Sequence, residues 1–317
     1  MRRSWQSWAY VRVREHGGVA EPELGPSLVG FPEHFAALVD GRAKRFPVWR
    51  TFGMQAVGAD DDGATIRLPI EPFLLDAAGG LPAGVLAVLA DSAVGCSLAV
   101  NMERGGFARP SVTVTLTVEP TVAELPTSGL LVCTGRLVAH HDPHVLMAAV
   151  VRDGQGAQIA EVRAWFSLLP GQVAREISWD DPDAAWGEDH GPLTGPDAGL
   201  GPIGAHLGLT LADGQLRLRS RPGLCNRLGT LHGGVGALLA DLAAGAAVRA
   251  TGAPCYQPLT STYSYLRTTG GSGALVDVEA EVVKPGRAVA MAESRVLTAD
   301  GRVALHAVVN ADVSARP

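Results

Sequence analysis

Apolar and polar residues alternate with a period of two along eight segments of the chain, as in strands that bury one face. The segments form two groups of four with similar spacing. They are 110–118, 130–137, 145–152 and 159–168, and then 258–266, 275–283, 288–297 and 303–313. Turn residues such as Asp153-Gly154 and Asp300-Gly301 separate them. The pattern therefore predicts two groups of four antiparallel strands.

A shorter pair of alternating segments precedes each group. The pairs are 53–57 with 65–70, and 207–210 with 215–219. An acidic turn ending at Gly63 joins the first pair, and Asp213-Gly214 joins the second. An Asp-Gly turn between apolar runs is a strong hairpin signal, so each group of strands is predicted to begin with a β-hairpin.

A run of small apolar residues lies between each hairpin and the strands that follow it. In 235–248 the one charged residue is Asp241, and a helix that is apolar all round is buried all round. Shifting the chain by 150 residues aligns 76–95 with 226–245, with ten identities in twenty positions. This ungapped match predicts an internal duplication with one buried helix in each copy.

The chain is thus predicted to contain two copies of one unit, built as strand, strand, helix and four strands. We place an N-terminal arm at 1–30, the first repeat at 31–170, a linker at 171–200 and the second repeat at 201–317. The linker is rich in Gly, Pro and Asp, as connections between domains often are. The expected fold class is α+β, with a curved antiparallel sheet around one long apolar helix in each repeat.

Composition and charge narrow the classes of function. The 317 residues are 47% hydrophobic and 18% charged, which argues for a large core and against disorder. A formal net charge of −6 argues against a nucleic-acid partner, because phosphate binding needs a basic surface. We expect no membrane partner, since no apolar run reaches roughly 18 residues and the N-terminus lacks a signal-peptide pattern.

The cysteines and histidines do not show the spacing of metal ligands. Cys96, Cys133, Cys225 and Cys255 form no C-x-x-C pair. Three histidines cluster in 140–144, where Asp and Pro predict a solvated turn. The sequence therefore predicts no metal site, and the low cysteine content favours a reducing, cytoplasmic location.

One motif in the second repeat indicates specific chemistry. Asn226, Gly229, His232, Gly233 and Gly234 form the pattern N-x-x-G-x-x-H-G-G, and Asp241 follows nine residues after the histidine. The motif resembles that of the hotdog-fold acyl-CoA thioesterases, specifically the phenylacetate-pathway (PaaI-type) group. The resemblance covers both repeats, although the motif is present in the second alone. It implies two tandem hotdog units and an acyl-CoA thioesterase without a dissociable cofactor, CoA being part of the substrate.

The two adjacent glycines of the motif open the predicted helix. Backbone N–H groups at a helix start lack intrahelical acceptors and lie at the positive end of the helix dipole. Because glycine has no side chain, a substrate carbonyl can approach closely and be held as in an oxyanion hole. In the resembled family the glycine after the histidine donates to the thioester oxygen and the asparagine assists. These residues are Gly233 and Asn226 here, with Gly234 next to the substrate, and His232 is expected to shape the turn.

The acid–base group is expected to come from the other helix. Eight residues separate Gly233 from Asp241, about 12 Å along a helix axis, so water at Asp241 cannot reach a carbonyl held at Gly233. A second helix packed in the opposite direction would supply Asp91, the equivalent residue of the first repeat. The sequence leaves open whether Asp91 acts as a general base toward water or as a nucleophile.

The first repeat has lost the elements of an oxyanion hole. Asp76, Pro82 and Ala83 stand at the positions of Asn226, His232 and Gly233. Proline has no backbone N–H to donate, and an aspartate would place negative charge beside a developing oxyanion. We therefore expect one working site per chain, with Asp241 vestigial or structural.

Four other residues are expected near the substrate. The resembled family holds its water with a Ser or Thr on the strand after the helix, and Ser111 is the nearest hydroxyl there. Arg267, Lys284 and Arg287 could contact the CoA phosphates through their charge. Because hotdog sheets present edges and faces that associate, a homo-oligomer of pseudo-dimers is expected.

Two other functions are compatible with this fold. A non-catalytic acyl-CoA binding or sensing protein would keep the helix start but lack a base, and the paired aspartates argue against it. A hotdog enoyl-CoA hydratase or dehydratase needs a catalytic histidine paired with an acidic residue inside the pocket. The one candidate for that histidine is His232, which is predicted to lie in the turn.

Overall fold

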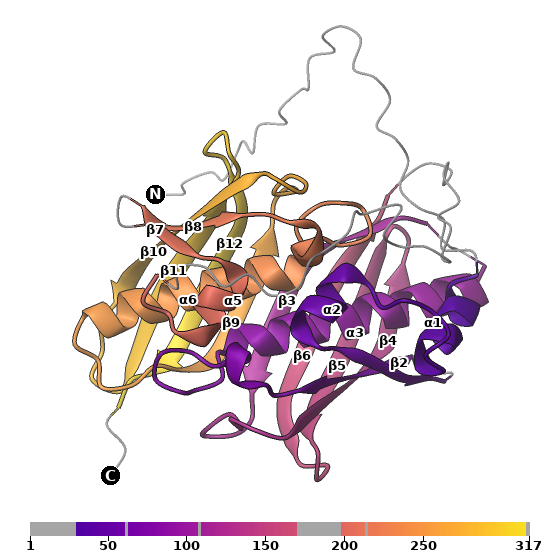
Figure 1. Cartoon of the computed structure of the whole chain (residues 1–317), viewed down its shortest axis with the longest axis horizontal. Coiled ribbons are helices and arrows are strands. Elements are labelled where there is room, and N and C mark those ends of the chain that lie inside the picture. The colour runs from indigo at the N-terminus through magenta and orange to yellow at the C-terminus, as the bar shows by residue number, and fades with distance from the viewer. Residues whose placement is uncertain (1–29, 61–62, 107–108, 170–197, 213–214, 315–317) are drawn as a thin grey trace, which may run out of the picture.

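A computed structural model describes residues 30–60, 63–106, 109–169, 198–212 and 215–314. Within these residues twelve strands form one sheet, in which every strand is antiparallel to its neighbours. The strands are β1 (Gln55–Ala59), β2 (Ala64–Pro69), β3 (Ser111–Pro120), β4 (Leu130–His141), β5 (His144–Asp153), β6 (Gln158–Leu168), β7 (Thr210–Ala212), β8 (Gln215–Arg219), β9 (Gln257–Tyr265), β10 (Leu275–Lys284), β11 (Val289–Leu297) and β12 (Val303–Asp312). Their order, β1-β2-β4-β5-β6-β3-β9-β12-β11-β10-β8-β7, places two six-stranded halves side by side (Figure 1).

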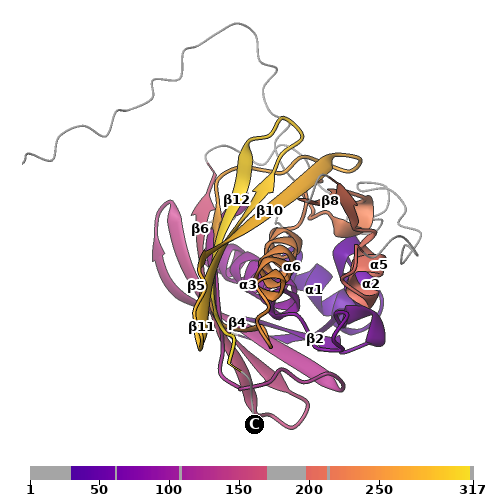
Figure 2. The same ribbon diagram turned by 90° about the vertical axis from the view of Figure 1, so that its left-hand side faces the viewer.

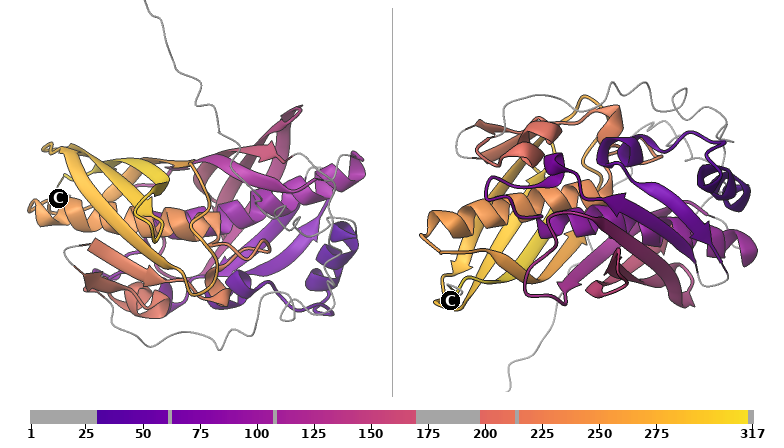
Figure 3. Two further views of the ribbon diagram at one scale, coloured as in Figure 1. Left: turned by 90° about the horizontal axis from the view of Figure 1, so that it is seen from above. Right: turned by 60° about the horizontal axis from the view of Figure 1, so that its bottom comes forward.

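Two long helices, α3 (Ala83–Arg104) and α6 (Gly233–Ala250), lie along the inner face of the curved sheet (Figure 2). They follow one another along the long axis of the molecule and overlap at its middle (Figure 3). Both are long and apolar enough to cross a membrane, but 94% and 72% of their most apolar windows are buried inside the protein. Their apolar composition is therefore explained by packing against the sheet and against each other.

Glycines allow the two helices to touch at their crossing. A Cβ atom on Gly84 would lie 2.6 Å from the Cα of Leu238, and one on Gly234 would lie 2.5 Å from the Cα of Val88. Real Cβ atoms do not approach backbone atoms this closely, so the crossing needs glycine at both positions. The two contacts are equivalent. Replacing Gly84 and Leu238 with their counterparts 150 positions away in the other repeat gives Gly234 and Val88, as expected for two helices that cross in opposite directions.

The same internal symmetry is present in the sheet. β3 and β9 meet at the centre, where Thr115 pairs with Ser264 and Leu116 pairs with Tyr263. A shift of 148 residues exchanges these two pairs, so a pseudo-twofold axis passes between them. The α+β fold predicted from the sequence, a curved antiparallel sheet around one long apolar helix in each half, is confirmed, and β3 and β9 join the two halves into one twelve-stranded sheet.

Three short helices were not predicted. α1 (Phe31–Val39), α2 (Pro47–Phe52) and α5 (Pro202–Leu207) lie on the side of α3 and α6 that the sheet leaves open (Figure 2), together with the 3₁₀ turns η1 (Pro72–Leu74) and η2 (Pro222–Leu224). The strands expected at 53–57 and 207–210 begin later, at Gln55 and Thr210. Gly53 and Gly208, with φ of 79° and 72°, end α2 and α5 in the left-handed conformation that glycine adopts freely.

Candidate active site

The helix crossing brings the aspartate of each helix to the start of the other helix. The Oδ2 atom of Asp91 accepts a hydrogen bond from the Gly234 N–H at 2.8 Å. The Oδ2 atom of Asp241 accepts the equivalent bond from the Gly84 N–H, also at 2.8 Å. The structure therefore places Asp91 of α3 next to the start of α6, as expected from the distance between Gly233 and Asp241 along one helix.

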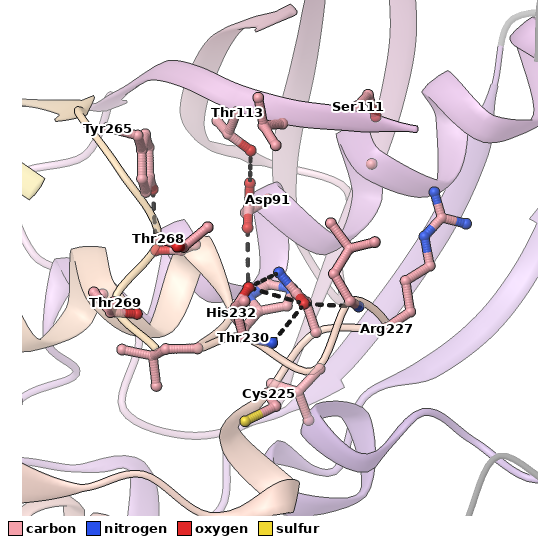
Figure 4. A pocket seen from close by; sticks show the side chains of 18 of the residues that line it. Asp91, Ser111, Thr113, Cys225, Arg227, Thr230, His232, Tyr265, Thr268 and Thr269 are labelled. Carbon is pink, nitrogen blue, oxygen red and sulfur yellow. Dashed lines mark hydrogen bonds and ion pairs between the residues drawn. The ribbon is translucent and has the colours of Figure 1, made fainter. Parts of the chain in front are cut away.

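A cavity of about 530 Å³ opens at the Asp91 end of this arrangement (Figure 4). Of the residues expected in the site, those that line it are Asp91, Ser111, Asn226, His232, Gly233 and Arg267. The walls come from α3, β3, the turn before α6 and the end of β9, so both halves of the chain contribute. A second cavity, of about 290 Å³, lies at the pseudo-symmetric position beside Asp241.

Gly233 brings a backbone N–H next to the Asp91 carboxylate. Among the described residues, none accepts a hydrogen bond from its N–H, which lies at the start of α6. A Cβ atom on Gly233 would lie 2.8 Å from Oδ2 of Asp91 and 3.4 Å from the ring of Tyr265, so the carboxylate and the ring closely flank this glycine. The Tyr265 hydroxyl donates to the Gly233 carbonyl at 3.0 Å. A carbonyl bound at this N–H would therefore lie beside the Asp91 carboxylate.

His232 caps the start of α6. Its Nδ1 accepts from the Gly234 N–H at 3.2 Å and lies 3.4 Å from Oδ2 of Asp91, and its Nε2 lies 3.4 Å from the Ser92 hydroxyl. Burial lowers the pKa of His232, and the nearby charge of Asp91 opposes this only in part. His232 thus lies in the cavity beside an acidic residue, which is the pairing that the hydratase alternative requires, and its Nδ1 also caps the start of α6.

Asn226 holds the turn before α6. Its Oδ1 accepts from the N–H groups of Leu228 and Thr230 at 2.9 and 3.3 Å, and its Nδ2 donates to the Thr230 hydroxyl at 3.0 Å. In the first repeat Asp76 forms the same turn, accepting from the N–H groups of Ala78 and Gly80. One N–H of the Asn226 amide is used within the turn and the residue lines the cavity, so its help to a thioester oxygen stays a prediction.

The hydroxyl that contacts the carboxylate belongs to Thr113. Its Oγ1 donates to Oδ1 of Asp91 at 3.1 Å. Ser111, the residue expected for this role, lines the cavity two positions earlier on β3, and no bond to Asp91 is formed by it among the described contacts. The alternation along β3 gave a signal for this, because residues two apart point to the same face.

Replacing Thr113 with valine should lower kcat/KM for thioester hydrolysis about tenfold, because a hydrogen bond to a charged group is lost while the side-chain shape is kept. The measurement is thiol release under identical conditions for both proteins. Ser111→Ala is the matched control and should lose less. If Ser111→Ala loses more activity than Thr113→Val, the position expected from the sequence is the functional one.

The second cavity is closed around its carboxylate. Asp241 is 1% exposed, and its Oδ1 accepts from the Tyr256 hydroxyl at 2.8 Å. Arg249 lies 3.6 Å from Asp76 in the same cavity. Pro82 has nearly the backbone angles of His232, with φ of −61° in both, but proline brings no N–H. The two turns therefore share their backbone shape and the side-chain bonds of Asp76 and Asn226, and they differ in the cap that His232 provides at the start of α6.

Asp241 should make stability depend on pH. Burial raises its pKa above the usual carboxyl value, and bonds from Gly84 and Tyr256 oppose this only in part. The folded state therefore binds this proton more tightly, so the contribution is fully present below the unfolded pKa and is lost as pH rises through the folded one. The Tm of Asp241→Asn, compared with wild type, should improve from about pH 4 to about pH 8. A difference in Tm that is the same at both pH values would contradict this.

The positive residues expected near CoA are not all in one place. Arg267 lines the cavity at an exposed edge. Lys284 and Arg287 line neither cavity. Lys284 is the last residue of β10 and Arg287 follows it, about 30 Å along the strand from its start beside the motif turn. Arg227, which the sequence did not single out, does line the cavity.

Comparison with known proteins agrees with this architecture. A model of the thioesterase superfamily matches residues 228–305, which begin within the motif turn and end in β12. Similar solved structures include a putative thioesterase from Novosphingobium aromaticivorans (15% identity, 81% of this chain and 98% of that chain, TM-score 0.55) and an acyl-CoA thioesterase II from Mycobacterium marinum (13%, 85% and 97%, 0.51). A third is a hot dog fold protein from Alicyclobacillus acidocaldarius (12%, 86% and 100%, 0.52). The fold is the hotdog fold. No curated protein matches the sequence.

Proposed function

We propose that the chain hydrolyses acyl-CoA thioesters at one site per chain. The observation that carries the proposal is the pairing, within one cavity, of the Asp91 carboxylate with the available N–H of Gly233. A carboxylate and a backbone donor on opposite sides of a bound carbonyl are what acyl transfer to water requires. The match to the thioesterase superfamily over 228–305 supports the same reaction class.

In the proposed reaction the thioester oxygen accepts a hydrogen bond from the Gly233 N–H. The N-terminal end of the α6 dipole stabilises the negative charge that develops on that oxygen. Asp91 either removes a proton from the attacking water or attacks the carbonyl carbon itself, giving an anhydride that water then cleaves. In the first route Asp91 passes the proton to sulfur as the carbon–sulfur bond breaks. In the second the thiolate leaves as the anhydride forms and takes a proton from solvent, and hydrolysis of the anhydride releases one proton again. Both routes yield a carboxylic acid and a free thiol.

Contacts around Asp91 suit this role. Thr113 and Gly234 each donate to one carboxylate oxygen, which fixes its orientation. Each oxygen retains a further lone pair for water or for the carbonyl carbon. CoA would reach the site past Arg267, at the exposed edge of the cavity.

The proposal is tested by measuring free-thiol release from a panel of acyl-CoAs with the purified full chain. Turnover of at least one ester is expected. If acyl-CoA binds with a measurable Kd and no ester releases thiol, the chain is a non-catalytic acyl-CoA binding protein.

A further inference from the structure

Tyr265 is the last residue of β9 and lies beside the start of α6. Its hydroxyl donates to the Gly233 carbonyl at 3.0 Å (Figure 4), and its ring lies 3.4 Å from the position that a Cβ atom on Gly233 would take. The residue lines the cavity together with Gly233 and Asp91. Tyr265 therefore contacts, with both its ring and its hydroxyl, the glycine whose N–H is available to a substrate carbonyl.

One peptide group is held from two sides at this point. The Gly233 carbonyl and the Gly234 N–H belong to the same planar peptide unit. Tyr265 of β9 donates to its oxygen, and Oδ2 of Asp91, on α3, accepts from its N–H at 2.8 Å. Hydrogen bonds in series polarise one another, so the bond to the oxygen strengthens the bond from the N–H to the carboxylate. A side chain of β9 thus acts on the Asp91 carboxylate through a single peptide unit.

The start of α6 needs such an anchor because it consists of two adjacent glycines. Glycine has the largest conformational freedom of any residue, and the first N–H groups of a helix have no intrahelical acceptor. The direction of the Gly233 N–H is therefore fixed less firmly by the helix than that of an N–H in its interior. Since the carbonyl and the N–H of a trans peptide point in opposite directions, the bonds to Tyr265 and Asp91 together oppose rotation of the peptide that follows Gly233.

Packing of the two helices alone does not require this tyrosine. The first half forms the equivalent cross-helix bond, from the Gly84 N–H to Asp241, at the same 2.8 Å. Its counterpart of β9 is β3, whose two buried residues are the aliphatic Leu116 and Val118. The helix crossing therefore forms with aliphatic side chains on the neighbouring strand, and the Tyr265 hydroxyl is an addition at the end that has the larger cavity.

We infer that Tyr265 is a positioning residue for thioester hydrolysis, which holds the Gly233 N–H toward the thioester oxygen and the Gly234 N–H toward Asp91. The inference rests on the proposed function. Burial raises the pKa of Tyr265, so its hydroxyl stays protonated and can donate at neutral pH. Because its proton is used by the Gly233 carbonyl, Tyr265 orients the site without donating to the substrate.

The test separates kcat from KM for thiol release from one well-hydrolysed acyl-CoA. Tyr265→Phe keeps the ring beside Gly233 and removes only the hydroxyl. We expect kcat to fall about 5- to 10-fold, the effect of one lost hydrogen bond, and KM to stay within about twofold, because the direction of the N–H matters most as charge develops on the oxygen. Tyr256→Phe is the matched control, since it removes a hydroxyl bond of 2.8 Å to Asp241 at the other end of the helix crossing, and it should keep the wild-type kcat.

Hydrogen exchange reports on the start of α6 independently of the reaction. The Gly234 amide, followed by NMR in the full chain, should exchange about 5- to 10-fold faster in Tyr265→Phe than in wild type, because the peptide opens more easily without the bond to its oxygen. In Tyr256→Phe it should exchange at the wild-type rate. Thermal unfolding should show that both variants remain folded.

An unchanged kcat in Tyr265→Phe overturns the inference and leaves the proposed function intact. A higher KM at unchanged kcat also overturns it, because the hydroxyl would then contact the substrate in its ground state. An equal loss of kcat in Tyr256→Phe would make the effect one of general packing, and unchanged exchange of the Gly234 amide in Tyr265→Phe would mean that the hydroxyl does not hold the start of α6. Either result overturns the inference. Absence of thiol release from every acyl-CoA overturns both the inference and the proposed function.

Discussion

Replacing Asp91 with asparagine should reduce kcat/KM for thioester hydrolysis about 10³-fold, while the same change at Asp241 should leave the rate near that of wild type. Asparagine has the size of aspartate and can still accept from the Gly234 N–H through its oxygen. What it lacks is the charge needed to take a proton from water or to attack the carbonyl. Thiol release from one well-hydrolysed acyl-CoA measures both variants.

Asp241→Asn is a matched control because the two residues are related by the pseudo-twofold axis. Each accepts from a glycine N–H of the other helix at 2.8 Å, so both substitutions change an equivalent bond at the helix crossing. Thermal unfolding should show that both variants remain folded. Loss of activity in Asp241→Asn alone would mean that the pairing is inverted, and equal partial losses would mean that both sites work.

The overall fold could be predicted because its signals are local and occur twice. Alternation along β3 to β6 and β9 to β12 follows directly from burying one face of each strand. The ungapped match between the two helical segments, 76–95 and 226–245, predicted the duplication. The short helices α2 and α5 were missed because six residues are too few for helical periodicity to emerge, and their ends depend on the left-handed Gly53 and Gly208.

The composite nature of the site was also predictable, because helix rise alone separates Gly233 from Asp241. The individual contacts within the site were less predictable from the sequence. The contact of Thr113 with Asp91 depends on how β3 sits over α3, and β3 has a bulge between Thr113 and Thr115 that changes its register with β6. Arg227 reads in the sequence as an ordinary turn residue, and only the folded structure places it on the cavity.

The glycines at the helix crossing provide the second large effect. Gly234→Ala and Gly84→Ala should each destabilise the fold by about 1–3 kcal/mol, because the new methyl group would meet backbone atoms of the opposite helix at 2.5 and 2.6 Å. Urea unfolding measures the free-energy change. Gly95→Ala is the control, since a Cβ there meets nothing within 4 Å, and helix propensity should make it neutral or stabilising by about 0.5–1 kcal/mol.

Activity should separate the two destabilised variants. Gly234→Ala moves the start of α6 away from Asp91, and a displacement of about 1 Å at reacting groups costs about 10²-fold in rate. Gly84→Ala acts on the Asp241 end, which lies outside the proposed site, so its loss should be much smaller. If both variants lose activity alike at similar stability, catalysis depends on helix packing as a whole and not on the Asp91 end. If Gly234→Ala loses much more activity than Gly84→Ala at equal stability, the two ends of the crossing have different roles. Both ends then contribute to packing, and only the Asp91 end contributes to the reaction.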